Sequence, residues 1–177
     1  VVPATVENGG VTYTVTAIGE AAFKWKDASS ITLPETLDTI RANAFNTFEV
    51  PELKLPSKVR YIGDYAFSGC KKLTSFVVPE SVEEIGNGAF FTCSNLTSIQ
   101  LPSKLKKIGK SVFYNCGLTS ITWPATLTTI PYSAFQACSK LETINIQSDL
   151  TMVDMMAFLR CSALKSINLP STVDSIG

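Results

Sequence analysis

The sequence contains no histidine, no surplus of charge of either sign and no long apolar run. Without histidine, the chain cannot form a Ser-His-Asp or Cys-His nucleophile system, the usual zinc ligand sets or a histidine-based pH switch. Fifteen Lys and Arg residues balance fifteen Asp and Glu residues, so the cationic excess that drives nucleic-acid binding is missing. No apolar run reaches the roughly 18 residues of a membrane-spanning helix. We therefore expect no nucleic-acid partner, no membrane insertion in this segment, and no metal or other cofactor.

A repeat of 22 or 23 residues occupies most of the 177-residue chain. An Ile or Val recurs at this interval, and a phenylalanine follows it five residues later in every copy that is long enough. The phenylalanines are Phe23, Phe45, Phe67, Phe90, Phe113, Phe135 and Phe158. Such regular spacing is typical of repeat architectures, in which successive copies stack and bury a shared core.

The spacing within one copy predicts three short segments. In the copy at residues 96–116, Ile99 and Leu101 alternate as in a short strand. A second short extended segment contains Ile108, and the apolar residues of 112–116 have helical spacing. We therefore predict an α/β repeat: a right-handed solenoid of about seven units, each with a short parallel strand, a second extended segment and a short helical turn.

The first seventeen residues differ from the repeats. Asn8, Gly9 and Gly10 lie between two alternating segments and predict a hairpin turn. We predict that residues 1–17 form an N-terminal β-hairpin cap and that residues 18–177 form the solenoid. The final copy stops before its phenylalanine, and we expect the solenoid to be C-terminally truncated.

The repeat resembles a known family. The patterns Leu-x-x-Ile-x-Leu-Pro, Leu-x-x-Ile-Gly and Ala-Phe-x-x-Cys, combined over residues 11–177, are similar to the BspA-type class of leucine-rich repeat. This resemblance implies a bacterial extracellular or cell-surface binding scaffold involved in adhesion, with no catalytic residues. The asparagine column of commoner leucine-rich repeats is absent, because the equivalent positions hold Thr36, Lys58, Ser81, Lys104, Thr126, Asp149 and Thr172.

Five cysteines each follow a phenylalanine by three residues: Cys70, Cys93, Cys116, Cys138 and Cys161. Their spacing fits no metal-ligand motif. Neighbouring copies are close enough for disulfides, but five thiols leave one unpaired. We favour a column of small, buried, unreactive side chains.

Charges also follow the repeat. The position two before each recurring Ile holds Asp38, Arg60, Glu83 and Lys106 in the first four copies, and the next column places Glu84 beside Lys107. The run of lysines at 104–110 is therefore expected to belong to a solvated ladder of opposite charges.

Two further columns flank the inward Ile of each predicted strand. Their side chains are expected to face solvent on the concave side, where solenoids commonly bind partners. We predict a binding face formed by Ser75, Val77, Ser98, Gln100, Ser120, Thr122, Thr143 and Asn145. Small polar side chains also suit any exposed strand, so this composition alone does not establish binding.

Phe91 and Tyr114 occupy equivalent positions in adjacent copies and predict a small aromatic patch on the outer face.

The sequence as a whole favours two classes of function. The first is a secreted or surface-attached, non-catalytic scaffold that binds a host or matrix protein. The alternative is a carbohydrate-binding module that uses the aromatic patch. An enzyme is not predicted, because the acidic residues are scattered over variable positions and form no convergent pair.

Overall fold

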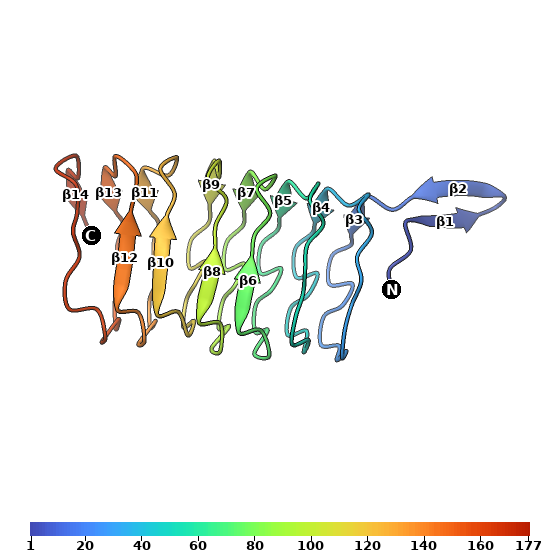
Figure 1. Cartoon of the computed structure of the whole chain (residues 1–177), viewed down its shortest axis with the longest axis horizontal. Helices are drawn as coiled ribbons and strands as arrows, with labels where there is room; N and C mark the ends of the chain where they lie inside the picture. The colour runs from blue at the N-terminus through green and yellow to red at the C-terminus, as the bar shows by residue number, and fades with distance from the viewer.

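The computed structural model describes all 177 residues and consists of strands and turns. Figure 1 shows a stack of similar coils along one axis, with a hairpin projecting from the N-terminal end. We call each coil a rung. The strands are β1 (Thr5–Asn8), β2 (Val11–Thr14), β3 (Ala17–Ile18), β4 (Thr39–Ile40), β5 (Tyr61–Ile62), β6 (Ser75–Val77), β7 (Glu84–Ile85), β8 (Ser98–Gln100), β9 (Lys107–Ile108), β10 (Ser120–Trp123), β11 (Thr129–Ile130), β12 (Thr143–Ile146), β13 (Met152–Val153) and β14 (Ser175–Ile176).

Equivalent residues of successive rungs are register partners. The short strands that contain the recurring Ile form a five-stranded parallel sheet (β3-β4-β5-β7-β9) and a three-stranded parallel sheet (β11-β13-β14). The longer strands at the front of Figure 1 pair only two at a time, as β6-β8 and β10-β12. The fold is therefore a β-solenoid of about seven turns, held by parallel pairing between neighbours.

The seven repeat phenylalanines form one continuous internal column. Adjacent rings are stacked with centroids 5.2 to 5.9 Å apart and planes within 24° of one another. The five central rings are fully buried, whereas the first and last, Phe23 and Phe158, are half-buried. This arrangement confirms that side chains from the same position in successive copies lie over one another.

The predicted α/β class is wrong, because the chain contains no helix. The segment around each phenylalanine consists of turns instead. Residues two before and two after each phenylalanine have positive φ, such as Ala21 and Trp25 around Phe23, and Ser111 and Asn115 around Phe113. A right-handed helix needs consecutive negative φ values, so these residues interrupt it twice in every rung.

Hydrogen bonds between rungs explain these left-handed residues. Ala21, Phe23 and Trp25 each donate the backbone N–H to a carbonyl of the next rung, at 2.8 to 3.1 Å, while Ala22 and Lys24 donate locally to the residue three before. Left-handed backbone costs a non-glycine residue about 1–2 kcal/mol. In the first six rungs, each such residue turns its N–H toward the next rung, where it satisfies a carbonyl that would otherwise lack a partner.

The N-terminal segment contains the expected hairpin, with β1 antiparallel to β2. Both of its strands are exposed along their whole length, and the hairpin points away from the stack in Figure 1. Val2 and Val15, on either side of it, pack against the core. The role of residues 1–17 as a cap stays a prediction.

The five cysteines form a second internal column next to the phenylalanines. All five are free and buried, and each thiol donates to a phenylalanine carbonyl of the preceding rung, at 2.9 to 3.1 Å. Burial raises the pKa of the Cys138 thiol to about 12 and that of Cys161 to about 11. The same desolvation raises the pKa of Cys70 and Cys116 further above the ordinary thiol range. The raised pKa leaves these four thiols with little of the thiolate character that metal binding and redox chemistry require, and the burial of all five favours a structural role.

The column that lacks asparagine is partly replaced by hydroxyl groups. Thr36, Ser81, Thr126 and Thr172 each donate a side-chain hydrogen bond to a carbonyl of the preceding rung. They occupy alternate rungs, and the rungs between them hold Lys58, Lys104 and Asp149 at this position. The hydroxyls therefore cap every second junction.

Backbone pairing between the strands is interrupted after β9. At five other junctions the residue after the recurring Ile or Val donates its N–H to the preceding rung, as Gly63 does to Ile40 (2.8 Å) and Asp154 does to Ile130 (2.9 Å). Pro131 occupies this position after β11 and has no N–H to donate. Neither β9 and β11 nor β8 and β10 belong to a common sheet, so the strand side has a break at this junction.

Candidate interaction surface

The strands β6, β8, β10 and β12 present one side-chain face to the core and the other to solvent. Phe76, Ile99 and Ile121 point inward and are buried, and the equivalent Ile144 is half-buried, because side chains alternate along a strand. The residues on either side of them are exposed, and we call these outward residues the front strand face. They are Ser75, Val77, Ser98, Gln100, Ser120, Thr122, Thr143 and Asn145.

Within each strand pair, the register places these residues side by side. Ser75 lies beside Ser98 and Val77 beside Gln100; in the second strand pair, Ser120 lies beside Thr143, and Thr122 beside Asn145. The structure therefore brings together all the residues predicted for the binding face. Because none of them is charged, the surface offers hydrogen bonds and small apolar contacts.

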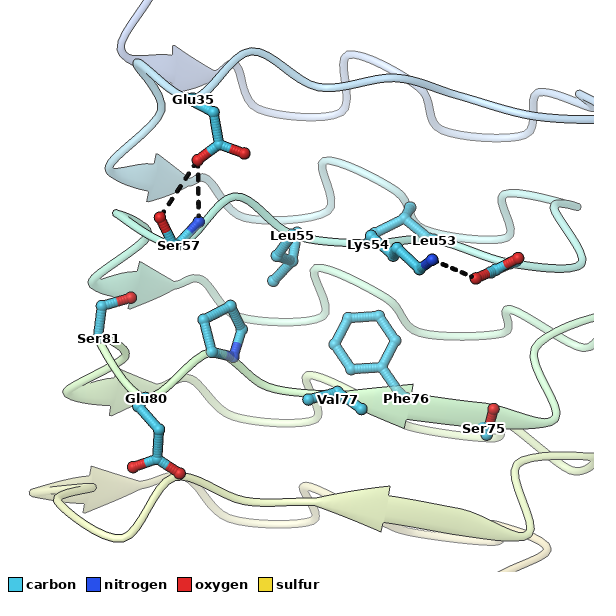
Figure 2. A pocket seen from close by; sticks show the side chains of 12 residues that line it. Glu35, Leu53, Lys54, Leu55, Ser57, Ser75, Phe76, Val77, Glu80 and Ser81 are labelled. Atoms are coloured by element: carbon cyan, nitrogen blue, oxygen red, sulfur yellow. Dashed lines mark hydrogen bonds and ion pairs between the residues drawn. The ribbon is translucent and has the colours of Figure 1, made fainter.

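A groove adjoins this face between residues 52–55 and β6 (Figure 2). It has a volume of about 640 Å³. Leu53, Leu55 and Phe76 contribute apolar atoms to it, and Val77, with 61% of its surface exposed, lies at its edge. The groove could not be predicted from the sequence, because it depends on which neighbouring segments fail to pair.

Acidic side chains border the groove. Glu35, Glu52 and Glu80 line it together with a single cation, Lys54, whose Nζ lies 3.1 Å from a carboxylate oxygen of Glu52. We call this feature the Glu-rimmed groove. Glu35 accepts hydrogen bonds from the N–H and hydroxyl of Ser57, both at 3.3 Å.

Glu80 makes the equivalent pair of bonds one rung beyond the groove. It accepts hydrogen bonds from the N–H and the hydroxyl of Ser103, at 3.0 and 2.9 Å. Neither Glu35 nor Glu80 lies within ion-pair distance of a cation. The groove therefore has two carboxylates whose charge is not neutralised by a neighbour.

The predicted aromatic patch lies on the turn side. The rings of Phe91 and Tyr114 are stacked with centroids 4.5 Å apart. Tyr65, which sequence reasoning did not assign to this patch, meets Phe91 edge-on at 6.1 Å and is 41% exposed. Its position follows from Gly88: a Cβ on Gly88 would come within 2.4 Å of the Tyr65 ring. Gly88 is therefore the residue in the sequence that could have indicated the position of the Tyr65 ring.

Three asparagines within four residues of Phe91 or Tyr114 in the sequence differ in how free their side chains are to bind a ligand. The side chain of Asn87 donates to Asp64 at 3.3 Å and accepts the N–H of Lys110 at 2.9 Å. Asn95 donates its amide to the Lys71 carbonyl at 2.8 Å. Asn115 makes no side-chain hydrogen bond within the chain and is exposed, so it is the amide best placed to bind a ligand there.

The predicted charge ladder is confirmed in its central part. Glu83 pairs with Lys106 at 2.7 Å and with Arg60 at 2.8 Å. Hydrogen bonds from Lys106 and Arg60 lower the pKa of the Glu83 carboxyl below its ordinary value. Glu84 and Lys107 are register partners, but no ion pair joins them.

No group of three or more His, Cys, Asp or Glu side chains is arranged to hold a metal ion. No helix has the length and hydrophobicity needed to cross a membrane. The features available for binding are the front strand face, the Glu-rimmed groove and the aromatic patch.

A stack of near-identical rungs with a polar strand face on one side defines a solenoid repeat protein. Comparison with protein families makes this specific. The sequence matches the family described as the BspA type leucine rich repeat region over residues 6–93 and 62–177. The chain belongs to this family.

Solved structures of related proteins share the fold. A leucine rich cell surface protein from Faecalibacterium prausnitzii is 25% identical, with a TM-score of 0.59 over 96% of this chain and 57% of that one. The pneumococcal vaccine antigen PcpA is 18% identical, with a TM-score of 0.61 over 97% of this chain and 60% of that one. A leucine rich repeat protein from T. pallidum is 22% identical, with a TM-score of 0.55 over 93% of this chain and 76% of that one.

The chain thus spans a little over half the length of the Faecalibacterium protein. A search of curated proteins found none that matches this sequence. The comparisons therefore establish the family and the fold.

Proposed function

We propose that this chain is a non-catalytic interaction scaffold of the bacterial cell surface, which binds a host or matrix protein through the front strand face. The observation that carries the proposal is the set of eight exposed, uncharged residues on the strand pairs β6-β8 and β10-β12, which are in register within each pair. A rigid, regular face of this kind suits a protein partner, because little side-chain order has to be imposed on binding.

The relatives support an extracellular location. The Faecalibacterium protein is a cell surface protein, and this chain belongs to the same class of repeat. The free, buried thiols are compatible with this location, since none is exposed to oxidants or positioned to exchange disulfides.

The test is binding to a panel of immobilised extracellular-matrix proteins. Gln100→Arg combined with Asn145→Arg is expected to abolish binding to the matrix protein that the wild type recognises, because two long cations are placed on the face. Ser139→Arg, at an exposed site outside that face, is the matched control. Equal binding by all three proteins would show that the face is not the interaction surface.

The aromatic patch favours a second candidate function, carbohydrate binding. Stacked rings beside a free amide are the elements of a sugar site, and Phe91, Tyr114 and Asn115 supply them. A glycan array is the direct test. Binding that is lost in Tyr114→Ala and retained in the Gln100→Arg, Asn145→Arg protein would assign recognition to the turn side.

A further inference from the structure

We infer that the Glu-rimmed groove takes an extended segment of a partner protein that carries Lys or Arg side chains, and that this segment adds to the free edge of β6. The inference rests on the proposed function, because it specifies the partner chemistry of one part of the same surface. It identifies a recognition site that differs in charge from the rest of the front strand face.

The edge of β6 that faces the groove has unpaired backbone groups. On the opposite edge, Thr74 accepts a hydrogen bond from the β8 side at 2.8 Å and Val78 donates one at 3.0 Å. Because successive residues of a strand direct their backbone groups to opposite edges, those of Ser75 and Val77 point toward the groove. No backbone hydrogen bond joins β6 to residues 52–56. Such an edge is a template for an added strand.

The groove has room and apolar surface for side chains of that added strand. Its volume is about 640 Å³, and Leu53, Leu55 and Phe76 line its apolar part, as Figure 2 shows. Side chains alternate along an extended peptide. Every second side chain of the occupant would therefore contact this apolar part or the exposed Val77.

Charge determines which side chains occupy the other positions. Three carboxylates, Glu35, Glu52 and Glu80, border the groove, and its only cation, Lys54, is already paired with Glu52. Electrostatic complementarity contributes mainly to specificity and to the rate of association. Lys or Arg side chains of the occupant would lie near Glu35 and Glu80, whereas acidic peptides and other anions would be repelled.

A capped heptapeptide of alternating Lys and Val tests the inference. Titrated into the full chain and followed by NMR, it is expected to shift the backbone amide signals of Ser75 and Val77. The corresponding Glu and Val peptide is the charge control and should not bind. Raising the salt concentration should weaken the Lys peptide, because exposed charges are screened.

Two variants separate the charge contribution from the backbone contribution. Glu35→Gln with Glu80→Gln is expected to weaken the Lys peptide about tenfold, with Glu142→Gln, exposed outside the groove, as the matched control. Val77→Pro removes an outward N–H and should also weaken binding, since proline is tolerated on an edge strand. If that variant loses its folded structure, a Lys and Val peptide that is N-methylated at alternate residues replaces it, and this peptide should not bind.

Equal affinity for the Lys and Glu peptides, no binding at millimolar concentration, or binding that survives both the Gln variants and N-methylation would overturn the inference. These outcomes are distinct from failure of the proposed function. A matrix protein that depends on Gln100 and Asn145 but not on Glu35 and Glu80 would support the scaffold and contradict the peptide site.

Discussion

The turn side and the strand side of this solenoid hold neighbouring rungs together differently. On the turn side, backbone N–H groups reach the next rung at every junction, from Ala21 to Ala42 (3.1 Å) through to Ala137 and Leu159 (2.8 Å). On the strand side, pairing stops between β8 and β10 and between β9 and β11. The front strands pair only two by two.

This difference assigns the stability of the stack to the turn side and partner binding to the strand side. The continuous turn ladder and the stacked phenylalanines keep the rungs in register, so the strand side can lose pairing without the stack coming apart. The interrupted strands leave edges and a groove accessible to a partner. Exposed edges are a liability in most proteins, and here the shortness of β6 and the neighbouring acidic side chains limit unspecific pairing.

The largest expected effect is on the turn side. Phe113→Ala removes a fully buried ring from the middle of the column and should reduce the free energy of unfolding by about 3–5 kcal/mol. Val77→Ala on the strand side is the comparison and should change it little, because Val77 is exposed. Chemical denaturation measures both. Similar losses in the two variants would contradict the division of roles.

Close contact between rungs at the corners gives the next largest effect. A Cβ on Gly109 would lie 2.4 Å from the backbone nitrogen of Asn87, whereas one on Gly19 meets nothing within 4 Å. Gly109→Ala is therefore expected to cost about 1–3 kcal/mol or more. Thermal unfolding should show a clear loss for Gly109→Ala and none for Gly19→Ala. A stable Gly109→Ala variant would mean that the rungs are further apart at this corner.

The thiol column gives a chemical comparison along the turn side. Without denaturant, a thiol reagent near pH 8 should label all five cysteines very slowly, because all five side chains are buried and the reagent cannot reach them. Burial raises the pKa of Cys161 less than that of Cys138, so Cys161 is expected to react before Cys138. Raised pKa values stabilise the fold below the ordinary thiol pKa, and this stabilisation is lost as the pH rises through 11 to 12. Mass spectrometry locates the labelled cysteines, and rapid labelling of Cys116 would contradict this prediction.

The smallest expected effect comes from the exposed charge ladder. Glu83→Gln removes the two ion pairs with Arg60 and Lys106. Since the pKa of Glu83 is lowered in the folded chain, its contribution is present above the ordinary carboxyl pKa and is lost as the pH falls through the lowered value. The wild type should therefore lose slightly more stability than Glu83→Gln between pH 7 and pH 3, when melting temperatures are compared at low salt. A larger loss of stability in Glu83→Gln would contradict the predicted direction of the pH effect.

The regular part of the fold could be predicted from the sequence. The interval of 22 or 23 residues fixes which side chains share a column, and the phenylalanine column and the front strand face follow from it. The helical turn was predicted wrongly because Val112, Phe113 and Cys116 have helical spacing, while the N–H groups of Ser111, Phe113 and Asn115 bond to another rung. The spacing of apolar residues within one rung does not reveal that these N–H groups bond to a different rung. The left-handed positions also carry little sequence signal, because most of them are not glycine.

The irregular features of the fold could be identified only in the structure. Pro131 stands in the sequence at the position after the recurring Ile, but only the structure shows that β9 and β11 are not paired at this junction. The Glu-rimmed groove likewise depends on missing pairing between residues that are far apart in the chain. Tyr65 joined the aromatic patch only through the space left by Gly88.

Amide hydrogen exchange in the native protein tests the contrast between the two sides most directly. The N–H of Thr128, at the interrupted junction, donates to no backbone carbonyl, whereas that of Thr151, one rung later, donates to Thr128 at 2.8 Å. On the turn side of the interrupted junction, Phe113 donates to Ala134 at 3.0 Å. We predict fast exchange at Thr128 and strong protection at Thr151 and Phe113. Equal protection at Thr128 and Thr151, or fast exchange at Phe113, would contradict a continuous turn ladder beside an interrupted strand side.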